Sequence, residues 1–487
     1  MQFASSVFSC KEFWTLICFY CDKPLVFGDS PYCLDKSLSI NLSLISTSLM
    51  AKEAKHDDSD RISNLSDSIL CRILSSLPTR DAVSTSILST RWQHLFASIF
   101  NLDVDFGISR YCPHIVKSFS NFVDKMLFFH SEGRIERFRL DHLDTLGIDA
   151  SRVCGWISAA LWRGVKEMNL VFDHYSNIIP MLPTALLFTS NTLVRLKLEI
   201  PFVMAVPVRV CLPSLKTLEL ESIVFEDDDS VKRLFSSCPI LEDLSITDCD
   251  LRNINCINIS NPSLKSLTLL VYGEQESCSF SLTFAIVFDL PNLVYLKYEG
   301  CVAKSYSVVN MPSLVRADIE ISRGHVYTRE RDALVELFQG IGSVKSLHLS
   351  VYPEALPVLS HKRFVAFQNL HKLTIFWWSQ KWKGTGLAEF LEFSPNLRTL
   401  ALANEVSFPT EKVPSCLVYQ LKKFKLTGFN DHTSLFGMVA YILKNATVLE
   451  KLTICPCRKL GIKEKFNITK QLLSIPRNSN KCQVMAF

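Results

Sequence analysis

A six-residue pattern of apolar positions recurs along most of the chain. In this pattern, Φ-x-x-Φ-x-Φ with Φ apolar, the second and third apolar residues alternate with polar ones, as in a strand buried on one face. The thirteen copies begin at Ile135, Val165, Leu193, Leu215, Leu241, Leu264, Leu293, Leu314, Val344, Leu370, Leu397, Leu421 and Leu449. Their spacing averages about 26 residues. We therefore expect thirteen strands in one repeating arrangement.

The segments between these strands contain amphipathic helical stretches and prolines. We expect helices within residues 153–162, 230–237, 329–338 and 386–393, and prolines such as Pro213 and Pro291 favour an extended entry into the next strand. The run Glu226-Asp-Asp-Asp229 suits the start of the second helix better than a metal site. Strand and helix repeated in one direction predict an α/β solenoid, with parallel strands on the concave face and helices outside. The period lies within the ~20–29 residues of leucine-rich repeats.

A shorter helical pattern precedes the repeats. Its first apolar stripe consists of Ile69, Leu70, Ile73 and Leu74. Ser66 or Asp67 can cap this helix, and Pro78 ends it. Two more stripes follow at residues 82–88 and 91–96. Three short helices in about forty residues cannot bury all these side chains among themselves, so either the rest of the chain or a partner covers some of them.

This segment resembles the F-box of plant F-box proteins. The match runs through Asp60-Arg61-Ile62-Ser63, Leu65, Asp67, Ile69-Leu70, Ile73-Leu74, Leu77-Pro78-Thr79, Asp81-Ala82-Val83, Thr85-Ser86, Leu88-Ser89 and Arg91-Trp92. The resemblance implies binding to the Skp-type adaptor of a cullin–RING ubiquitin ligase. Carried over by position, the adaptor contact or packing residues are Leu65, Ile69, Leu70, Ile73, Leu74, Leu77, Pro78 and Trp92. Ser66 replaces a usual Pro and Phe96 a common Trp, which implies weakened rather than absent binding.

The rest of the chain resembles leucine-rich repeats and, at its C-terminal end, a further domain. The repeat that begins at Leu241 carries Cys249 and Leu251 at offsets typical of leucine-rich repeats, and Cys301 and Cys457 share the offset of Cys249. The C-terminal part resembles the FBD domain of many plant F-box/LRR proteins, through Val413-Pro414-Ser415-Cys416-Leu417, Leu421-Lys422, Gly428, Leu449, Pro476-Arg477 and Cys482-Gln483. From this we infer only a C-terminal cap on the solenoid, which open repeat arrays need.

These patterns divide the chain into four expected parts. They are a poorly patterned N-terminal extension over residues 1–55, an F-box over 56–105, a leucine-rich-repeat solenoid over 106–410 and an FBD domain over 411–487. Met50 can serve as the functional start, in which case the preceding segment is dispensable.

Composition and charge exclude several classes of protein. Lys and Arg number 52 against 48 Asp and Glu, a balance that argues against a dedicated nucleic-acid binder. The apolar stretch over residues 13–20 is far shorter than the ~20 residues that cross a bilayer, and no clear signal sequence accompanies it. We expect an intracellular protein without a membrane partner, in the cytoplasm, the nucleus or both, whose 17 cysteines are mostly reduced. Cys18 and Cys21 lie near other cysteines at spacings too irregular to predict zinc.

Catalytic motifs are absent from the sequence. It contains no Walker A loop, dinucleotide glycine fingerprint, His-Glu-x-x-His or Gly-x-Ser-x-Gly. We expect no catalytic residues, metal or cofactor. A hydrolase would need a polar cluster in a deep pocket, and no residue indicates a small-molecule co-ligand of the kind that some hormone-sensing relatives use.

The polar residues between the apolar strand positions should line the concave face. The candidates for binding a target are Arg195, Lys197, Glu219, Asp243, Tyr295, Lys297, Arg316, Lys372, Phe376 and Lys425. Their mixed signs suit a protein or peptide partner. In Phe376-Trp377-Trp378-x-x-x-Trp382, adjacent Trp side chains point to opposite faces of a strand; core packing is favoured there over a binding anchor.

The patterns together predict a function. We expect a non-catalytic substrate-recognition adaptor of an SCF-type cullin–RING E3 ubiquitin ligase, whose F-box docks the Skp-type adaptor and whose repeats bind a target protein for ubiquitination. The alternative is a leucine-rich-repeat interaction scaffold that is not assembled into a ligase. Co-expression with the adaptor separates the two.

Overall fold

The structure is a computed structural model. It describes residue 62 and residues 64–105, 113–130, 134–143, 148–172, 182–272, 282–321, 328–351, 366–377, 387–403, 413–429, 432–456 and 461–486. The N-terminal extension expected over residues 1–55, with Met50, Cys18 and Cys21, lies outside the described residues, as do Trp378, Trp382 and Cys457.

One long parallel sheet runs through the described part of the chain. Its fifteen strands are β1 (Asn101–Asp105), β2 (Arg137–Leu143), β3 (Glu167–Phe172), β4 (Arg195–Glu199), β6 (Thr217–Glu221), β8 (Asp243–Thr247), β10 (Ser266–Val271), β12 (Tyr295–Gly300), β14 (Arg316–Ile321), β15 (Ser346–Val351), β16 (Lys372–Trp377), β17 (Thr399–Ala403), β18 (Lys423–Phe429), β19 (Lys451–Pro456) and β20 (Gln483–Ala486), hydrogen-bonded in this order. The thirteen strands from β2 to β19 are the thirteen predicted repeats, in sequence order, and this confirms the predicted fold class.

The register keeps apolar residues of neighbouring strands level with one another. Leu196 pairs with Leu218, Leu218 with Leu244, and Leu244 with Leu267. All four side chains are buried. Each repeat therefore builds its core against the repeat before and the repeat after it, as expected for a solenoid.

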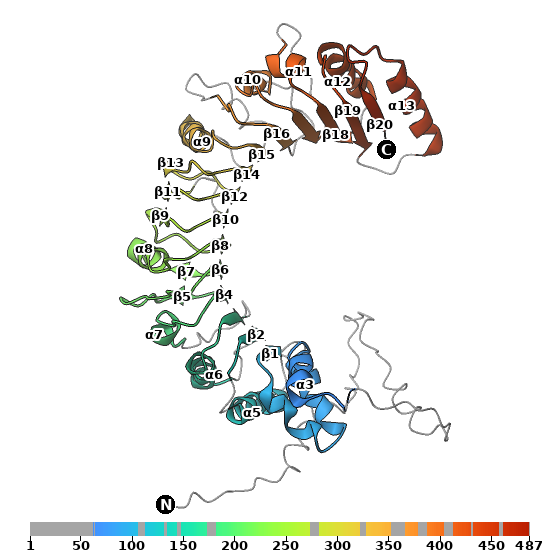
Figure 1. Cartoon of the computed structure of the whole chain (residues 1–487). Helices are drawn as coiled ribbons and strands as arrows, with labels where there is room; N and C mark the ends of the chain where they lie inside the picture. The colour runs from blue at the N-terminus through green and yellow to red at the C-terminus, as the bar shows by residue number, and fades with distance from the viewer. Residues whose placement is uncertain are drawn as a thin grey trace, which may run out of the picture.

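The outer side of the solenoid carries helices and a few short strands. The helices are α5 (Pro113–Phe129), α6 (Ala150–Trp162), α7 (Thr184–Leu187), α8 (Asp228–Ser236), α9 (Thr328–Gly340), α10 (Leu387–Glu392), α11 (Ser415–Tyr419), α12 (His432–Asn445) and α13 (Ile462–Ser474). Short outer strands are β9 (Cys256–Ser260), β11 (Ala285–Asp289) and β13 (Ser305–Asn310), which form one small sheet, and β5 (Val203–Met204) and β7 (Val224–Phe225), which form another. Figure 1 shows the result as an open arc, with the long sheet along its inner edge.

The acidic run at the start of α8 has a structural role. The Asp227 carboxylate accepts a hydrogen bond from the Ser230 backbone N–H at 2.6 Å, which caps the helix, and bonds from Ser230 lower the pKa of Asp227. The Asp228 carboxylate accepts a bond from the Asn255 backbone N–H at 2.7 Å, on the next turn of the solenoid. The prediction of a capped helix start is confirmed.

The F-box segment is joined directly to the first strand of the sheet. It consists of α3 (Asp67–Leu74), α4 (Thr79–Ser84) and two 3₁₀ helices, η1 (Thr85–Ile87) and η2 (Trp92–Ser98). The Ser75 hydroxyl accepts from the Phe100 backbone N–H at 2.9 Å, and the Thr79 hydroxyl from the Asp103 N–H at 2.6 Å. The first bond satisfies the backbone N–H of the residue just before β1 and the second a backbone group on the edge of β1, so the F-box closes this end of the sheet.

Candidate functional site

The apolar stripe of α3 is divided lengthwise by the fold. Leu70 and Leu74 are 0% and 1% exposed and belong to the same core as Trp92. Ile69 and Ile73, one residue earlier in each turn, are 47% and 44% exposed. The buried residues hold the F-box together, whereas the exposed pair is the part of the stripe that a partner can reach.

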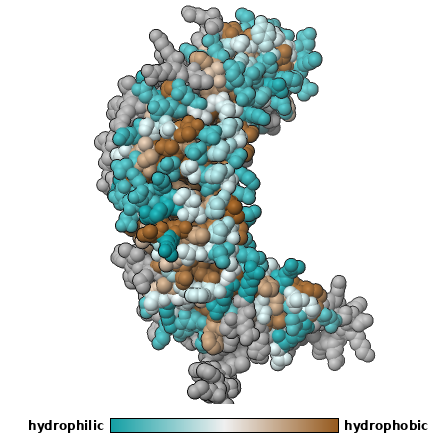
Figure 2. Space-filling model, turned by 60° about the vertical axis from the view of Figure 1, so that its left-hand side comes forward, coloured by the Kyte–Doolittle hydropathy of each residue, from teal (hydrophilic) through white to brown (hydrophobic). Residues whose placement is uncertain are grey.

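Other apolar side chains of the F-box are also exposed. Leu77 and Pro78 are exposed after α3, and Leu65 is half-buried before it. Ile62, Ile87 and Leu88 are exposed as well but were not among the predicted adaptor contacts. Ile87 and Leu88 belong to the predicted apolar stripe at residues 82–88, so the sequence pattern could have identified them. Figure 2 shows apolar side chains among hydrophilic ones at this end of the molecule. Such a concentration of exposed apolar side chains in one small module is typical of a protein interface.

Arg91 anchors the beginning of α3. Its Nε and Nη2 donate to Asp67 Oδ1 at 2.9 and 2.6 Å, and Nη2 also donates to the Leu65 carbonyl. Ser66 occupies the N-cap position, but its hydroxyl accepts no backbone N–H and lies 3.0 Å from the Ser68 hydroxyl. The prediction that Ser66 or Asp67 caps this helix with its side chain is therefore wrong. The bonds from Arg91 tether the helix start instead.

Phe96, which replaces the Trp common in F-box sequences, leaves the F-box core intact. Phe96 is 4% exposed and packs in the same core as Trp92 and Leu95. An aromatic ring thus fills the position at which F-box sequences often have Trp.

The predicted target-binding residues all lie on the inner face of the sheet. Arg195, Lys197, Glu219, Asp243, Tyr295, Lys297, Arg316, Lys372, Phe376 and Lys425 occupy strand positions that alternate with buried ones, and each is exposed or half-buried. Trp377, next to Phe376, is completely buried, in agreement with the favoured interpretation of core packing.

Oppositely charged residues form ion pairs on this face, both within a strand and between neighbouring strands. Lys197 Nζ lies 3.3 Å from Glu199 and 3.0 Å from Glu221 on the adjacent strand. Burial opposes the charge of Lys197, yet hydrogen bonds to Glu221 and Glu199 raise its pKa. Lys297 Nζ likewise lies 2.9 Å from Glu299. These pairs hold the long side chains against the sheet.

Another set of contacts on the inner face centres on the aromatic ring of Tyr295. The Tyr295 hydroxyl donates to Asp318 at 2.9 Å, and Arg316 Nη2 lies 2.7 Å from the same carboxylate. The Arg316 guanidinium also lies 5.3 Å from the centroid of the Tyr295 ring. Burial and the bond to Asp318 raise the pKa of Tyr295, so its hydroxyl stays protonated near neutral pH. These contacts tie Tyr295, Arg316 and Asp318 to one another on the inner face.

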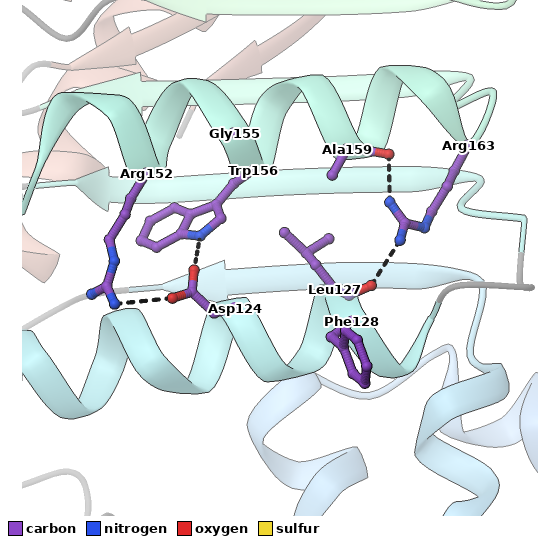
Figure 3. A pocket seen from close by; sticks show the side chains of 8 residues that line it. All are labelled: Asp124, Leu127, Phe128, Arg152, Gly155, Trp156, Ala159 and Arg163. Atoms are coloured by element: carbon purple, nitrogen blue, oxygen red, sulfur yellow. Dashed lines mark hydrogen bonds and ion pairs between the residues drawn. The ribbon is translucent and has the colours of Figure 1, made fainter. Parts of the chain in front are cut away.

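A shallow hollow of about 330 Å³ lies between α5 and α6 (Figure 3). Its polar side chains bind one another or the backbone: Trp156 Nε1 donates to Asp124 at 2.6 Å, and Arg152 lies 3.1 Å from the same carboxylate. Arg163 donates to the carbonyls of Leu127, Ala159 and His130. These groups therefore fasten one helix to the other and are not arranged as a catalytic site.

The repeat cysteines are buried as predicted. Cys249 and Cys301 are 6% and 5% exposed, and burial raises the pKa of Cys249 to about 12, which keeps its thiol protonated. In the part of the chain that the structure describes, no group of three or more His, Cys, Asp or Glu side chains is arranged to hold a metal ion. Over the same residues, every helix is too short or too polar to cross a membrane.

Comparison with known proteins decides the family. A model described as "At1g61320/AtMIF1, LRR domain" matches residues 126–485, and an F-box domain model matches residues 62–101. The F-box/FBD/LRR-repeat protein At1g78750 of Arabidopsis thaliana is 32% identical over 459 residues, which cover 88% of this chain and 96% of the relative. The chain belongs to the plant F-box/FBD/LRR-repeat family.

Two more Arabidopsis relatives agree with this assignment. The F-box/LRR-repeat protein At4g14096 is 34% identical over 423 residues, covering 81% of this chain and 87% of its own. The FBD-associated F-box protein At4g10400 is 32% identical over 437 residues, covering 87% and 99%. The resemblance to F-box/FBD/LRR-repeat proteins is confirmed. In this F-box/FBD/LRR-repeat protein, the residues that resemble the FBD domain continue the long sheet through β18, β19 and β20.

Proposed function

We propose that this protein is the substrate-recognition adaptor of an SCF-type cullin–RING ubiquitin ligase. The observation that carries the proposal is the exposed apolar surface of the F-box, centred on Ile69, Ile73 and Leu77. A Skp-type adaptor that covers these side chains removes them from water, and burying one such side chain completely is worth ~1.5–3 kcal/mol. The inner face of the solenoid then holds the target protein.

In this proposal the protein itself makes and breaks no bond. The Ser75 and Thr79 hydroxyls bind the F-box to β1, so that the F-box and the sheet form one body. A target on the inner face is therefore kept at a fixed distance and orientation from the ligase, which raises the effective concentration of its lysines at the site of ubiquitin transfer.

We also propose that the protein works inside the cell, in the cytoplasm, the nucleus or both. Ten cysteines lie among the described residues, and none of the ten forms a disulfide bond with another described cysteine. This is the state expected in a reducing compartment.

The adaptor surface is tested by replacing its exposed residues rather than Leu70 and Leu74, whose substitution would disrupt the core. In the full chain, Ile69→Asp with Ile73→Asp should weaken binding to the Skp-type adaptor by at least ~30-fold, as expected for the loss of ~2 kcal/mol or more at an interface hot spot. The measurement is the dissociation constant by biolayer interferometry.

The matched control is Val208→Asp, which places the same charge at a residue that is 87% exposed between β5 and β6. This variant should bind the adaptor like the wild type. Equal binding by the double variant and the wild type would refute the docking surface. A wild-type chain that binds no adaptor at all would favour the interaction scaffold.

A further inference from the structure

The inner face of the sheet changes character in its C-terminal third. From β15 to β20, the described inner-face positions carry four lysines and neither Asp nor Glu. These four, Lys372, Lys423, Lys425 and Lys451, are all exposed, and we refer to them as the basic face. Burial lowers the pKa of His348 on β15, against the attraction of Asp318, so this imidazole adds no charge near neutral pH.

Elsewhere on the inner face, basic side chains have acidic partners. From β2 to β14 they are Arg137, Arg139, Arg195, Lys197, Lys297 and Arg316, and each forms at least one ion pair. The four lysines of the basic face form no ion pair with any described residue. The nearby Glu450 is bound to Lys422 at 2.9 Å, and Lys423 also helps to lower the pKa of this carboxyl without forming an ion pair with it. Among the described residues, the basic face therefore lacks the direct ion pairs that the rest of the inner face has.

Strand register brings three of these charges together. Lys423 on β18 and Lys451 on β19 are paired residues of adjacent parallel strands, whose backbones lie ~4.8 Å apart. Lys425 lies two residues further along β18, on the same face. Like charges directly opposite one another destabilise a sheet. The pairing of Lys423 with Lys451 does not stabilise the isolated chain, whereas a ligand of opposite charge would relieve the repulsion.

The small side chains of β17 leave the basic face open in its middle. The inner-face residues of β17 are Thr399, Ala401 and Ala403, which separate Lys372 on β16 from Lys423 on β18. None of the three can compensate a lysine charge. Three of the four lysines, Lys372, Lys423 and Lys425, thus lie on the two strands that flank β17, whose inner-face side chains are small and uncharged.

We propose that the basic face binds an acidic segment, rich in Asp and Glu, of the target protein. This inference rests on the proposed function, in which the inner face holds the target. Lysines act as point charges and lack the bidentate fork of arginine, so binding depends mainly on the charge density of the segment and weakens with salt.

The remaining inner face favours a peptide over a nucleic acid. Between β4 and β14 it carries four basic residues and seven acidic ones: Arg195, Lys197, Lys297 and Arg316 against Glu199, Glu219, Glu221, Asp243, Glu299, Asp318 and Glu320. A long polyanion that starts on the basic face would be repelled there, whereas a protein can present an acidic segment to the basic face and neutral or basic residues to the remainder.

The test uses the full chain purified with its Skp-type adaptor. The probe is a fluorescein-labelled decapeptide of alternating Glu and Asp, and fluorescence anisotropy gives its affinity. The variant is Lys423→Gln, Lys425→Gln and Lys451→Gln. The matched control is Lys232→Gln, Lys463→Gln and Lys470→Gln, which removes three exposed lysines from α8 and α13.

We expect the wild type and the control to bind the decapeptide, and the variant to bind at least tenfold more weakly. The thermal midpoint of the variant should equal or exceed that of the wild type, because repulsion between Lys423 and Lys451 is relieved. No decapeptide binding by an intact wild-type complex would overturn the inference and leave adaptor docking untouched. Equal losses in variant and control, or tighter binding of a ten-nucleotide single-stranded DNA than of the decapeptide, would also overturn it.

Discussion

Where the chain leaves a strand, the backbone conformation restricts which residue types can occupy the position. Ser222, Asp248 and Gly300 follow or end strands of the long sheet with φ angles of 59°, 52° and 138°. The first two lie in the left-handed region that short polar residues tolerate. At Gly300, a Cβ atom would lie 1.8 Å from the Val271 carbonyl oxygen. Close approach of β12 to β10 therefore requires glycine at this position.

Gly300→Ala should destabilise the central repeats by about 2–4 kcal/mol, the combined effect of a strained φ and an overlap with backbone. Urea unfolding followed by circular dichroism measures the change. Gly155→Ala is the matched control, since a Cβ at this position in α6 meets nothing within 4 Å. Alanine should stabilise this helix by ~0.5–1 kcal/mol. Equal stability of the two variants would contradict this view of Gly300.

Among the secondary-structure elements, α3 has one apolar stripe that contributes both to the core of the F-box and to its exposed surface. The sequence predicted a single apolar stripe of Ile69, Leu70, Ile73 and Leu74, and the helix is present. Which half of the stripe faces the core depends on the position of η2, which packs against α3, and of β1, which packs against α4. Periodicity within the helix does not contain this information, so the sequence did not separate core residues from exposed ones.

The strands were predictable because their signal is local. The thirteen frames each alternate apolar and polar residues, and the alternation alone requires one buried face. The frame Ile99-x-x-Leu102-x-Val104 also fits β1 and was missed, whereas β20 has Lys481 at its first apolar position. In the middle repeats, the segment Cys256–Ser260 alternates in the same way and forms an outer strand, for which neither a strand nor a helix was predicted.

The connection between the F-box and β1 can be tested by Thr79→Val. Valine has the shape of threonine but accepts no hydrogen bond, so the Asp103 backbone N–H loses its partner at a cost of ~1–3 kcal/mol. Hydrogen exchange followed by mass spectrometry should become faster in α3, α4 and β1, with β6 to β14 unchanged. Thr79→Ser, which retains the hydroxyl, should behave like the wild type. Faster exchange spread evenly over the repeats would contradict a local connection.

The whole molecule is an open arc with unlike ends. The F-box closes the sheet at β1, and β20 with α13 forms the other end (Figure 1). The sequence indicated mixed charges on the inner face but not their division into compensated and uncompensated regions. Lys197 reaches Glu221 because register places β4 beside β6, 24 residues later in the chain. Such pairing depends on the assembled sheet, which explains why the basic face was not recognised from the sequence.

Stoichiometric assembly with a Skp-type adaptor is the most direct test of the proposed role in a ubiquitin ligase. The full chain is co-expressed with the adaptor, and size-exclusion chromatography with light scattering gives the mass of the product. We expect a one-to-one complex, in which hydrogen exchange slows over α3 and η1 and stays unchanged on the inner strands β6 to β14. Separate elution of the two proteins, or slowed exchange on the inner strands in place of the F-box, would contradict this role.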